Sequence, residues 1–268
     1  EAGAVGLFAG TLRHSGAVQA TAVETVDGKV WLKAKDSVEV AGSVTARRGA
    51  KGGEIVVTGG STLLAAAATL DASGAQGGGQ VYVGGGWQGK DAAIANAQST
   101  RVDQGAQLRA DAIEVGDGGT VVVWSDGHTA SHGSISARGG ARGGDGGQVE
   151  TSGKTLARSG LPDVSAPKGQ AGTWLLDPDQ VVIRAGFGSG GFTGDVGAGD
   201  LVPTEVFESE IEGYTGNLTI QARRAITAAD WGSACGSDGV LDAPFNGGLR
   251  LETTDASCPT TPCGIDLI

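Results

Sequence analysis

Short segments that alternate between hydrophobic and polar residues recur along the chain, separated by glycine-rich stretches. A Gly-Gly pair stands just ahead of Ile55-Val56-Val57, Val81-Tyr82-Val83 and Val121-Val122-Val123. Brief alternating runs rich in β-branched residues and bounded by glycine are typical of β-strands. The pattern therefore predicts many short strands and almost no helix.

These segments belong to a repeat. Stretches beginning at Gly16, Gly42, Ala68, Ala106 and Gly133 align, each with a strand ending in an alanine, a polar or glycine-rich turn and a second strand. One interval is longer and contains residues 87–100, which we interpret as a loop inserted into one copy. The central alanines are otherwise about 27 residues apart: Ala20, Ala46, Ala72, Ala110, Ala137 and Ala166.

A repeat of this length, with short strands and glycine turns, predicts a parallel β-helix, an all-β solenoid with inserted loops. Each coil stacks on the next at about 4.8 Å, and we expect glycine where the corners need a positive φ. An antiparallel sandwich or propeller is the alternative. It is disfavoured because tight two-residue hairpin signals such as Asn-Gly are missing from the repeats.

The texture of the sequence changes near residue 184. We predict regular coils with glycine-rich turns over residues 1–183, and a continued β-helix with longer loops and a cysteine cluster over residues 184–268. The segment 184–203 is rich in glycine and lacks clear alternation, so we expect a second large loop there.

Composition supports a folded core and excludes other glycine-rich classes. The chain holds 50 Gly but only 7 Pro among 268 residues, without the strict triplet of collagen. Hydrophobic residues make up 39% and charged residues 18%, which disfavours intrinsic disorder. Methionine is absent, so we expect Glu1 to be an internal position of a longer precursor.

The net charge of −11 argues against nucleic acid as a partner, because binding to phosphates requires clustered Lys and Arg. It also disfavours an anionic membrane surface. No stretch approaches the roughly 18 uninterrupted apolar residues of a membrane span.

Two motifs carry a family resemblance. Gly143–Gly153 has the form Gly-Gly-x-Gly-Gly-x-Val-Glu-Thr-Ser-Gly, and Ala171–Pro178 reads Ala-Gly-Thr-Trp-Leu-Leu-Asp-Pro. Both are similar to stretches of filamentous-haemagglutinin-like exoproteins, the passengers of two-partner secretion systems, which include adhesins and haem-acquisition exoproteins. The resemblance implies a right-handed parallel β-helix exported by a dedicated outer-membrane β-barrel transporter. The family's secretion domain carries an Asn-Pro step, which is missing here, so we expect this chain to be shaft and the transporter to contact a region outside it.

The function implied is that of a segment of a secreted bacterial adhesin at the extracellular cell surface, serving as structural shaft and adhesive scaffold. A host or sister-cell surface protein or glycan is the expected partner, and end-to-end self-association into filaments is a further expectation. We expect neither enzymatic activity nor a cofactor. Two alternatives stay open: binding of haem or a haem carrier, and a solenoid that degrades polysaccharide.

Few residues suggest specific chemistry. Cys235, Cys258 and Cys263 cluster near the end of the chain, and in an exported protein a disulfide between two of them is the default expectation. His128 and His132 form an H-x3-H pair, but residues four apart on a strand are about 13 Å apart, so solvated turn histidines are favoured over a metal or haem site.

The inserted loop supplies the predicted binding residues Trp87, Gln88 and Lys90, with Trp87 as an exposed aromatic for carbohydrate contact. The competing interpretation of Trp87 is packing on the solenoid surface. Asp177 and Asp179 resemble a catalytic acid pair, although Pro178 favours a structural turn. The run at 143–147 is similar to a calcium-binding repeat, but its aspartate is misplaced and the unit does not iterate.

Overall fold

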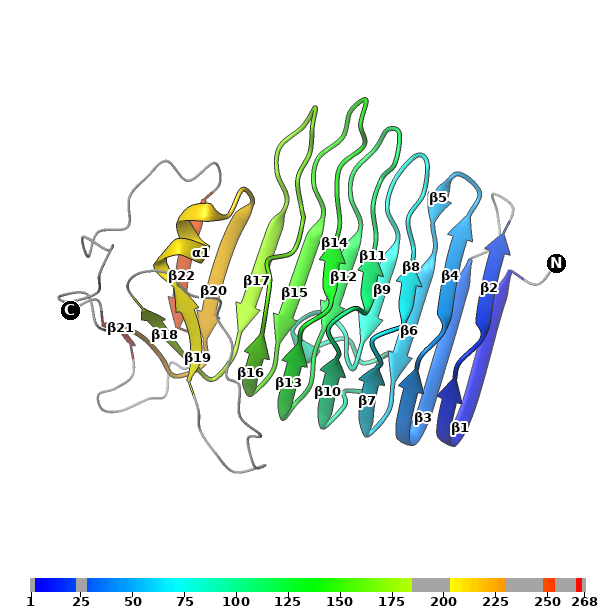
Figure 1. Ribbon diagram of the computed structural model, residues 1–268, viewed down its shortest axis with the longest axis horizontal. Helices are drawn as coiled ribbons and strands as arrows, with labels where there is room; N and C mark the ends of the chain where they lie inside the picture. The colour runs from blue at the N-terminus through cyan, green and yellow to red at the C-terminus, as the bar shows by residue number, and fades with distance from the viewer. Residues whose placement is uncertain (1–2, 23–27, 185–202, 230–247, 254–263, 267–268) are drawn as a thin grey trace.

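The computed structural model describes residues 3–22, 28–184, 203–229, 248–253 and 264–266. These form a parallel β-helix whose coils stack in chain order along the long axis of the molecule (Figure 1). This confirms the fold predicted from the repeat. The described part of the chain contains no helix long and apolar enough to cross a membrane.

The main sheet has thirteen strands and two connected rows. Its first row starts with β1 (Ala4–His14) beside β3 (Lys29–Val40) and continues through β6 (Glu54–Thr58), β9 (Gln80–Val83), β12 (Thr120–Val123), β15 (Gln148–Ser152), β17 (Thr173–Asp177), β20 (Asn217–Ala222) and β22 (Leu249–Thr253). The second row joins the far end of β3 and comprises β7 (Ser61–Leu64), β10 (Ser99–Val102), β13 (His128–Ser131) and β16 (Thr155–Arg158).

A second sheet closes the coil. It contains β2 (Ala17–Ala22), β4 (Ser43–Arg48), β8 (Thr69–Asp71), β11 (Gln107–Arg109) and β14 (Ser134–Ser136), with the short β5 (Lys51–Gly52) antiparallel to β4. A third sheet holds β19 (Thr204–Phe207), β18 (Gln180–Arg184), β21 (Ala225–Ala229) and β23 (Gly264–Asp266). Because β20 pairs with β17 and β21 with β18, the stack extends past residue 184. The domain division predicted there stays a prediction.

The core consists of inward side chains stacked in register from coil to coil. Alternation along each short strand turns every second residue inward, so one position per coil forms a continuous column. The best-defined column is buried along its whole length: Val30, Ile55, Val81, Val121, Val149, Trp174 and Leu218. Small and β-branched residues predominate because the coil is narrow.

The repeat alanines form another buried column, but the prediction that Ala166 belongs to it was wrong. Ala46, Ala72, Ala110 and Ala137 are fully buried, whereas Ala166 lies outside the column. Val164 takes the equivalent place, since its carbonyl accepts the N–H of Gly172 as the Ala137 carbonyl accepts that of Gly147. The sequence alignment was therefore displaced by two residues in that copy.

Glycines recur where backbone approaches backbone between coils. A Cβ on Gly79 would lie 2.1 Å from the Gly53 carbonyl oxygen, one on Gly119 1.9 Å from that of Gly79, and one on Gly147 2.0 Å from that of Gly119. These glycines do not have positive φ. Positive φ occurs at other glycines, as expected for corners, whereas the glycines of this ladder are required by the close packing of coils.

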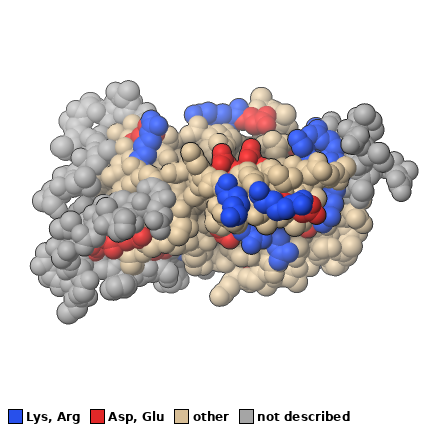
Figure 2. Space-filling view, turned by 90° about the horizontal axis from the view of Figure 1, so that it is seen from above, with Lys and Arg blue, Asp and Glu red and all other residues tan. Residues whose placement is uncertain are grey.

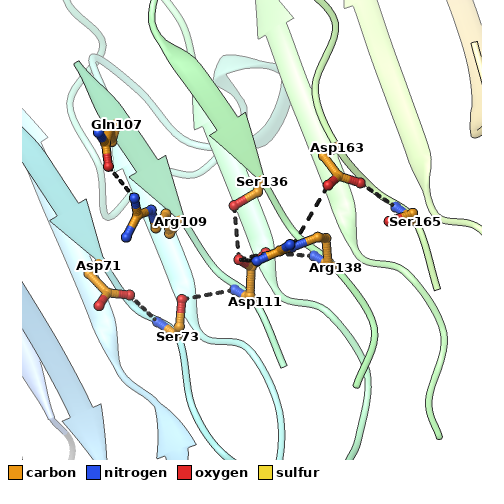
Figure 3. A network of polar contacts seen from close by, with 9 residues as sticks. All are labelled: Asp71, Ser73, Gln107, Arg109, Asp111, Ser136, Arg138, Asp163 and Ser165. Carbon is orange, nitrogen blue, oxygen red and sulfur yellow. Dashed lines mark hydrogen bonds and ion pairs between the residues drawn. The ribbon is translucent and has the colours of Figure 1, made fainter. Parts of the chain in front are cut away.

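Polar side chains flank the alanine column and join neighbouring coils (Figure 3). The buried Asp111 carboxylate accepts hydrogen bonds from the Ser136 hydroxyl at 3.0 Å and from the backbone N–H and guanidinium of Arg138 at 2.8 and 2.9 Å. Asp71 and Asp163 accept backbone N–H groups from Ser73 and Ser165. On the described part of the face seen from above, basic and acidic side chains lie next to one another (Figure 2).

A buried ion pair attaches the helix α1 (Glu208–Gly213) to the coils. Arg158 donates to both carboxylate oxygens of Glu210 at 3.0 and 2.8 Å, with only 2% and 8% of these side chains exposed. The guanidinium also lies 5.0 Å from the ring centre of Trp174, which packs edge-on against Tyr214. This cluster fills the interior where the chain leaves the regular repeat.

We predict that Gly119→Ala lowers the free energy of unfolding by about 3 kcal/mol, because a backbone clash cannot be relieved by rotating a side chain. Thermal and denaturant melts followed by circular dichroism would measure this loss. Gly213→Ala is the control, since a Cβ there meets nothing within 4 Å. Equal stability of the two variants would contradict the packing role of the glycine ladder.

Candidate functional site: a cleft beside the inserted loop

The inserted loop comprises residues 84–98, between β9 and β10, whereas the same connection between β6 and β7 takes only residues 59–60. The predicted loop 87–100 thus overlapped the start of β10. The inserted loop lies against the outer face of the main sheet: the Thr58 hydroxyl donates to the Ala95 carbonyl at 2.6 Å, and Lys33 donates to that of Ala93 at 3.2 Å.

Trp124 is the platform on which the inserted loop packs. A Cβ on Gly85 or Gly89 would lie 2.5 or 2.6 Å from atoms of its indole, so only glycine permits this contact. The indole N–H donates to Asp126 at 3.1 Å, and the Asn96 amide donates to the same carboxylate oxygen at 2.9 Å and to the Gly89 carbonyl at 3.0 Å. These contacts fix the conformation of the loop.

Glu150 on β15 connects the inserted loop to the main sheet. Its side chain points to the outer face of β15 but is fully buried, and the backbone N–H of Gln88 donates to its Oε2 at 2.7 Å. Its Oε1 has no hydrogen-bond partner among the described residues. Burial raises the pKa of Glu150 to about 8, although the Gln88 N–H and the Ser152 hydroxyl oppose this shift. The carboxyl is therefore mostly protonated at neutral pH.

Gln88 adopts a left-handed conformation, with φ of 52° and ψ of 24°, which is uncommon outside glycine. The Gln88 side-chain oxygen accepts a hydrogen bond from Lys90 at 2.9 Å, and the Gln88 side-chain amide donates to Gln221 on β20 at 2.8 Å. Gln221 in turn donates to Glu252 on β22 at 2.5 Å. The loop is thus tied to coils well beyond its own.

A cleft of about 520 Å³ opens between the inserted loop and the ends of β12, β15, β17 and β20. Asp179 at its edge is 8% exposed and ion-paired with Arg223 at 2.9 Å, with Arg224 at 3.9 Å. Asp177 is half-buried, and burial raises its pKa from the ordinary value. Other residues that line the cleft are Gln88, Lys90, Trp124, Asp126 and Lys154.

The structure places the predicted loop residues unequally. Gln88 and Lys90 line the cleft, whereas Trp87 is half-buried and is not among its lining residues. Lys90 is exposed. The sequence did not point to Trp124, Glu150 or Lys154 as parts of this site. Trp124 follows one strand and the other two residues belong to a different coil, so no local sequence pattern connects them.

The predicted histidine pair bonds to the next coil. Nδ1 of His128 lies 2.8 Å from the Thr155 hydroxyl, and Nδ1 of His132 lies 3.0 Å from that of Ser159. Burial and Arg101 lower the pKa of His132, although Asp103 opposes the shift. Within the part of the chain that the structure describes, no three His, Cys, Asp or Glu side chains come together as a metal site.

The remaining predicted features are the glycine run, the cysteines and the second loop. Asp145, in the glycine run at 143–147, accepts the backbone N–H of Gln170 in the next coil at 2.8 Å. Cys235, Cys258 and Cys263 lie outside the described residues, as does most of the predicted loop 184–203. Their disulfide and loop assignments stay predictions.

No protein-family model and no curated protein matches the chain. Among solved structures it is similar to the HMW1 secretion domain from Haemophilus influenzae, with 30% sequence identity and a TM-score of 0.52. The similarity covers 65% of this chain and 46% of that one, so the chain spans less than half of that domain. It supports the β-helical fold and is consistent with the family resemblance.

We predict that Glu150→Gln flattens the dependence of stability on pH. In the wild-type protein the unfolded chain loses this proton near pH 4.5 but the folded chain only near pH 8, so stability falls as pH rises between these values. The decrease is at most about 1.4 kcal/mol per pH unit. The variant should therefore gain stability relative to wild type from pH 5 to pH 8.5.

Denaturant melts at closely spaced pH values would measure this gain. Glu114→Gln is the control, because the Glu114 side chain is 57% exposed and should leave the slope unchanged. A constant difference between Glu150→Gln and wild type across the range would contradict a buried, protonated Glu150.

Proposed function

We propose that this chain is a shaft segment of a secreted bacterial surface adhesin of the filamentous-haemagglutinin type, and that it presents an adhesive loop on a rigid scaffold. The observation that carries the proposal is the pairing of successive coils from β1 to β22, with a long loop inserted between β9 and β10. In a solenoid each coil contacts only its neighbours, so length can be extended without a new core. Such a rod suits the display of binding groups away from a cell.

The similarity to a secretion domain adds support for export, since the solved structure is itself named for secretion. We propose that an outer-membrane transporter of the two-partner type exports the parent protein and contacts a region outside this chain. The extracellular face of the bacterial surface is then its location. A host or sister-cell surface molecule is the partner.

An export assay tests the assignment to the shaft. We expect the chain behind a signal peptide to stay in the periplasm of cells that carry the HMW1 transporter, and to reach the medium when the HMW1 secretion domain precedes it. Immunoblots of periplasm and medium give the readout, and the secretion domain alone is the positive control. Export of the unfused chain would instead identify it as a secretion domain.

Electron microscopy of the purified chain tests the rod and its self-association. We expect elongated particles of uniform width, some joined end to end, because the first coil leaves the outer edge of β1 without a partner strand among the described residues. Phe8 on this strand is 67% exposed and Leu7 39%. Leu7→Lys should reduce joined particles without shortening single ones, and Leu161→Lys is the control at another exposed position. Joined particles in equal number for both variants would contradict stacking through β1.

A further inference from the structure

The cleft beside the inserted loop contains polar groups that the protein's own contacts leave unused. The half-buried Asp177 carboxylate and the exposed Lys154 ammonium make no side-chain hydrogen bond or ion pair with the described residues. Both line the cleft, yet they form no ion pair with one another. The cleft therefore carries one acceptor and one donor to which no described side chain is hydrogen-bonded.

An aromatic surface lies in the same cleft. Gly85 and Gly89 pack against the Trp124 indole, and Trp124 is also among the residues that line the cleft. The N–H of the ring is already bonded to Asp126, which holds the indole in one orientation. A fixed aromatic surface beside a free carboxylate and a free ammonium is suited to a ligand with one apolar face and hydroxyl groups at its edge.

The other charged side chains of the cleft already make hydrogen bonds or ion pairs within the protein. Arg223 is paired with Asp179, and Lys90 is bonded to Gln88. The lining carries as many Lys and Arg as Asp residues, so it offers no net charge to a polyanion. Among the described lining residues Trp124 is the one large apolar side chain, which disfavours lipids and apolar peptides.

We propose that this cleft binds a neutral oligosaccharide, with a sugar ring against Trp124 and its hydroxyl groups bonded to Asp177 and Lys154. Sugar rings have an apolar C–H face and hydroxyls that both donate and accept, which matches these three groups. The volume of about 520 Å³ lies within the range of ligand pockets. The inference rests on the proposed adhesive role, to which it adds the class of partner.

The contacts beneath the inserted loop keep this site preorganised. Glu150 holds the Gln88 backbone, and the Gln88 side chain bridges to Gln221, so the wall of the cleft is fixed before a ligand arrives. A prearranged site loses less conformational entropy on binding. The loop thus supports the cleft instead of offering Trp87 as an exposed contact.

The test is a neutral-glycan array probed with the full chain, followed by titration calorimetry with the best-retained glycan. We expect Asp177→Asn and Lys154→Gln each to weaken binding roughly tenfold through the loss of a charged hydrogen bond. Trp124→Phe should weaken it as well while keeping an aromatic ring for the loop to pack on. Lys168→Gln, at an exposed position outside the cleft, and Trp31→Phe are the matched controls and should bind as wild type.

Several results would overturn the inference. These are retention of no neutral glycan, unchanged binding by both Asp177→Asn and Lys154→Gln, or binding of acidic or zwitterionic ligands alone. Melts of each variant show whether it is folded, so a loss of binding in a folded variant reports on the cleft. Elongated particles that bind no glycan would overturn this site and leave the scaffold role standing, whereas export of the unfused chain would contradict the shaft role without affecting the cleft.

Discussion

The stacking of backbone on backbone between successive coils is the constraint on which the rest of this protein depends. Parallel strands in register bring each coil about 4.8 Å from the next, and at the Gly53, Gly79, Gly119 and Gly147 positions the approach leaves no room for a Cβ. The same register aligns the apolar columns and brings Asp111 to Arg138 across neighbouring coils. A side chain in this ladder would separate coils and disrupt several of these contacts together.

The inserted loop adds a concave surface to an otherwise regular stack of coils. It lies over the outer face of the sheet, where Glu150 is buried, and it encloses a cleft that Trp124 helps to line. The local backbone of Gln88 departs from the usual conformation to make this contact. Such departures persist where surrounding contacts determine them, and they concentrate at functional sites.

The same principle holds at the other irregular region, where α1 packs onto the coils. Arg158 and Glu210 are both buried, and their bidentate hydrogen bonding together with the nearby Trp174 ring reduces the cost of removing two charges from water. Both irregularities therefore rely on buried charged or ionisable groups, Glu150 in one and the Arg158–Glu210 pair in the other. The rigid coils supply the fixed positions that such groups need.

The sequence by itself determined the fold, because a short strand period with glycine pairs permits few architectures, and it located the insertion to within a few residues. It also placed Gln88 and Lys90 in the loop that forms the cleft. Only the tertiary structure decided that Trp124 rather than Trp87 lines it, that Val164 replaces Ala166 in the buried column, and that Lys154 and Asp177 line the same cleft. The physical reason is that periodicity fixes which way a residue faces within its coil. What covers that face depends on a loop from a distant coil, and no local pattern encodes that contact.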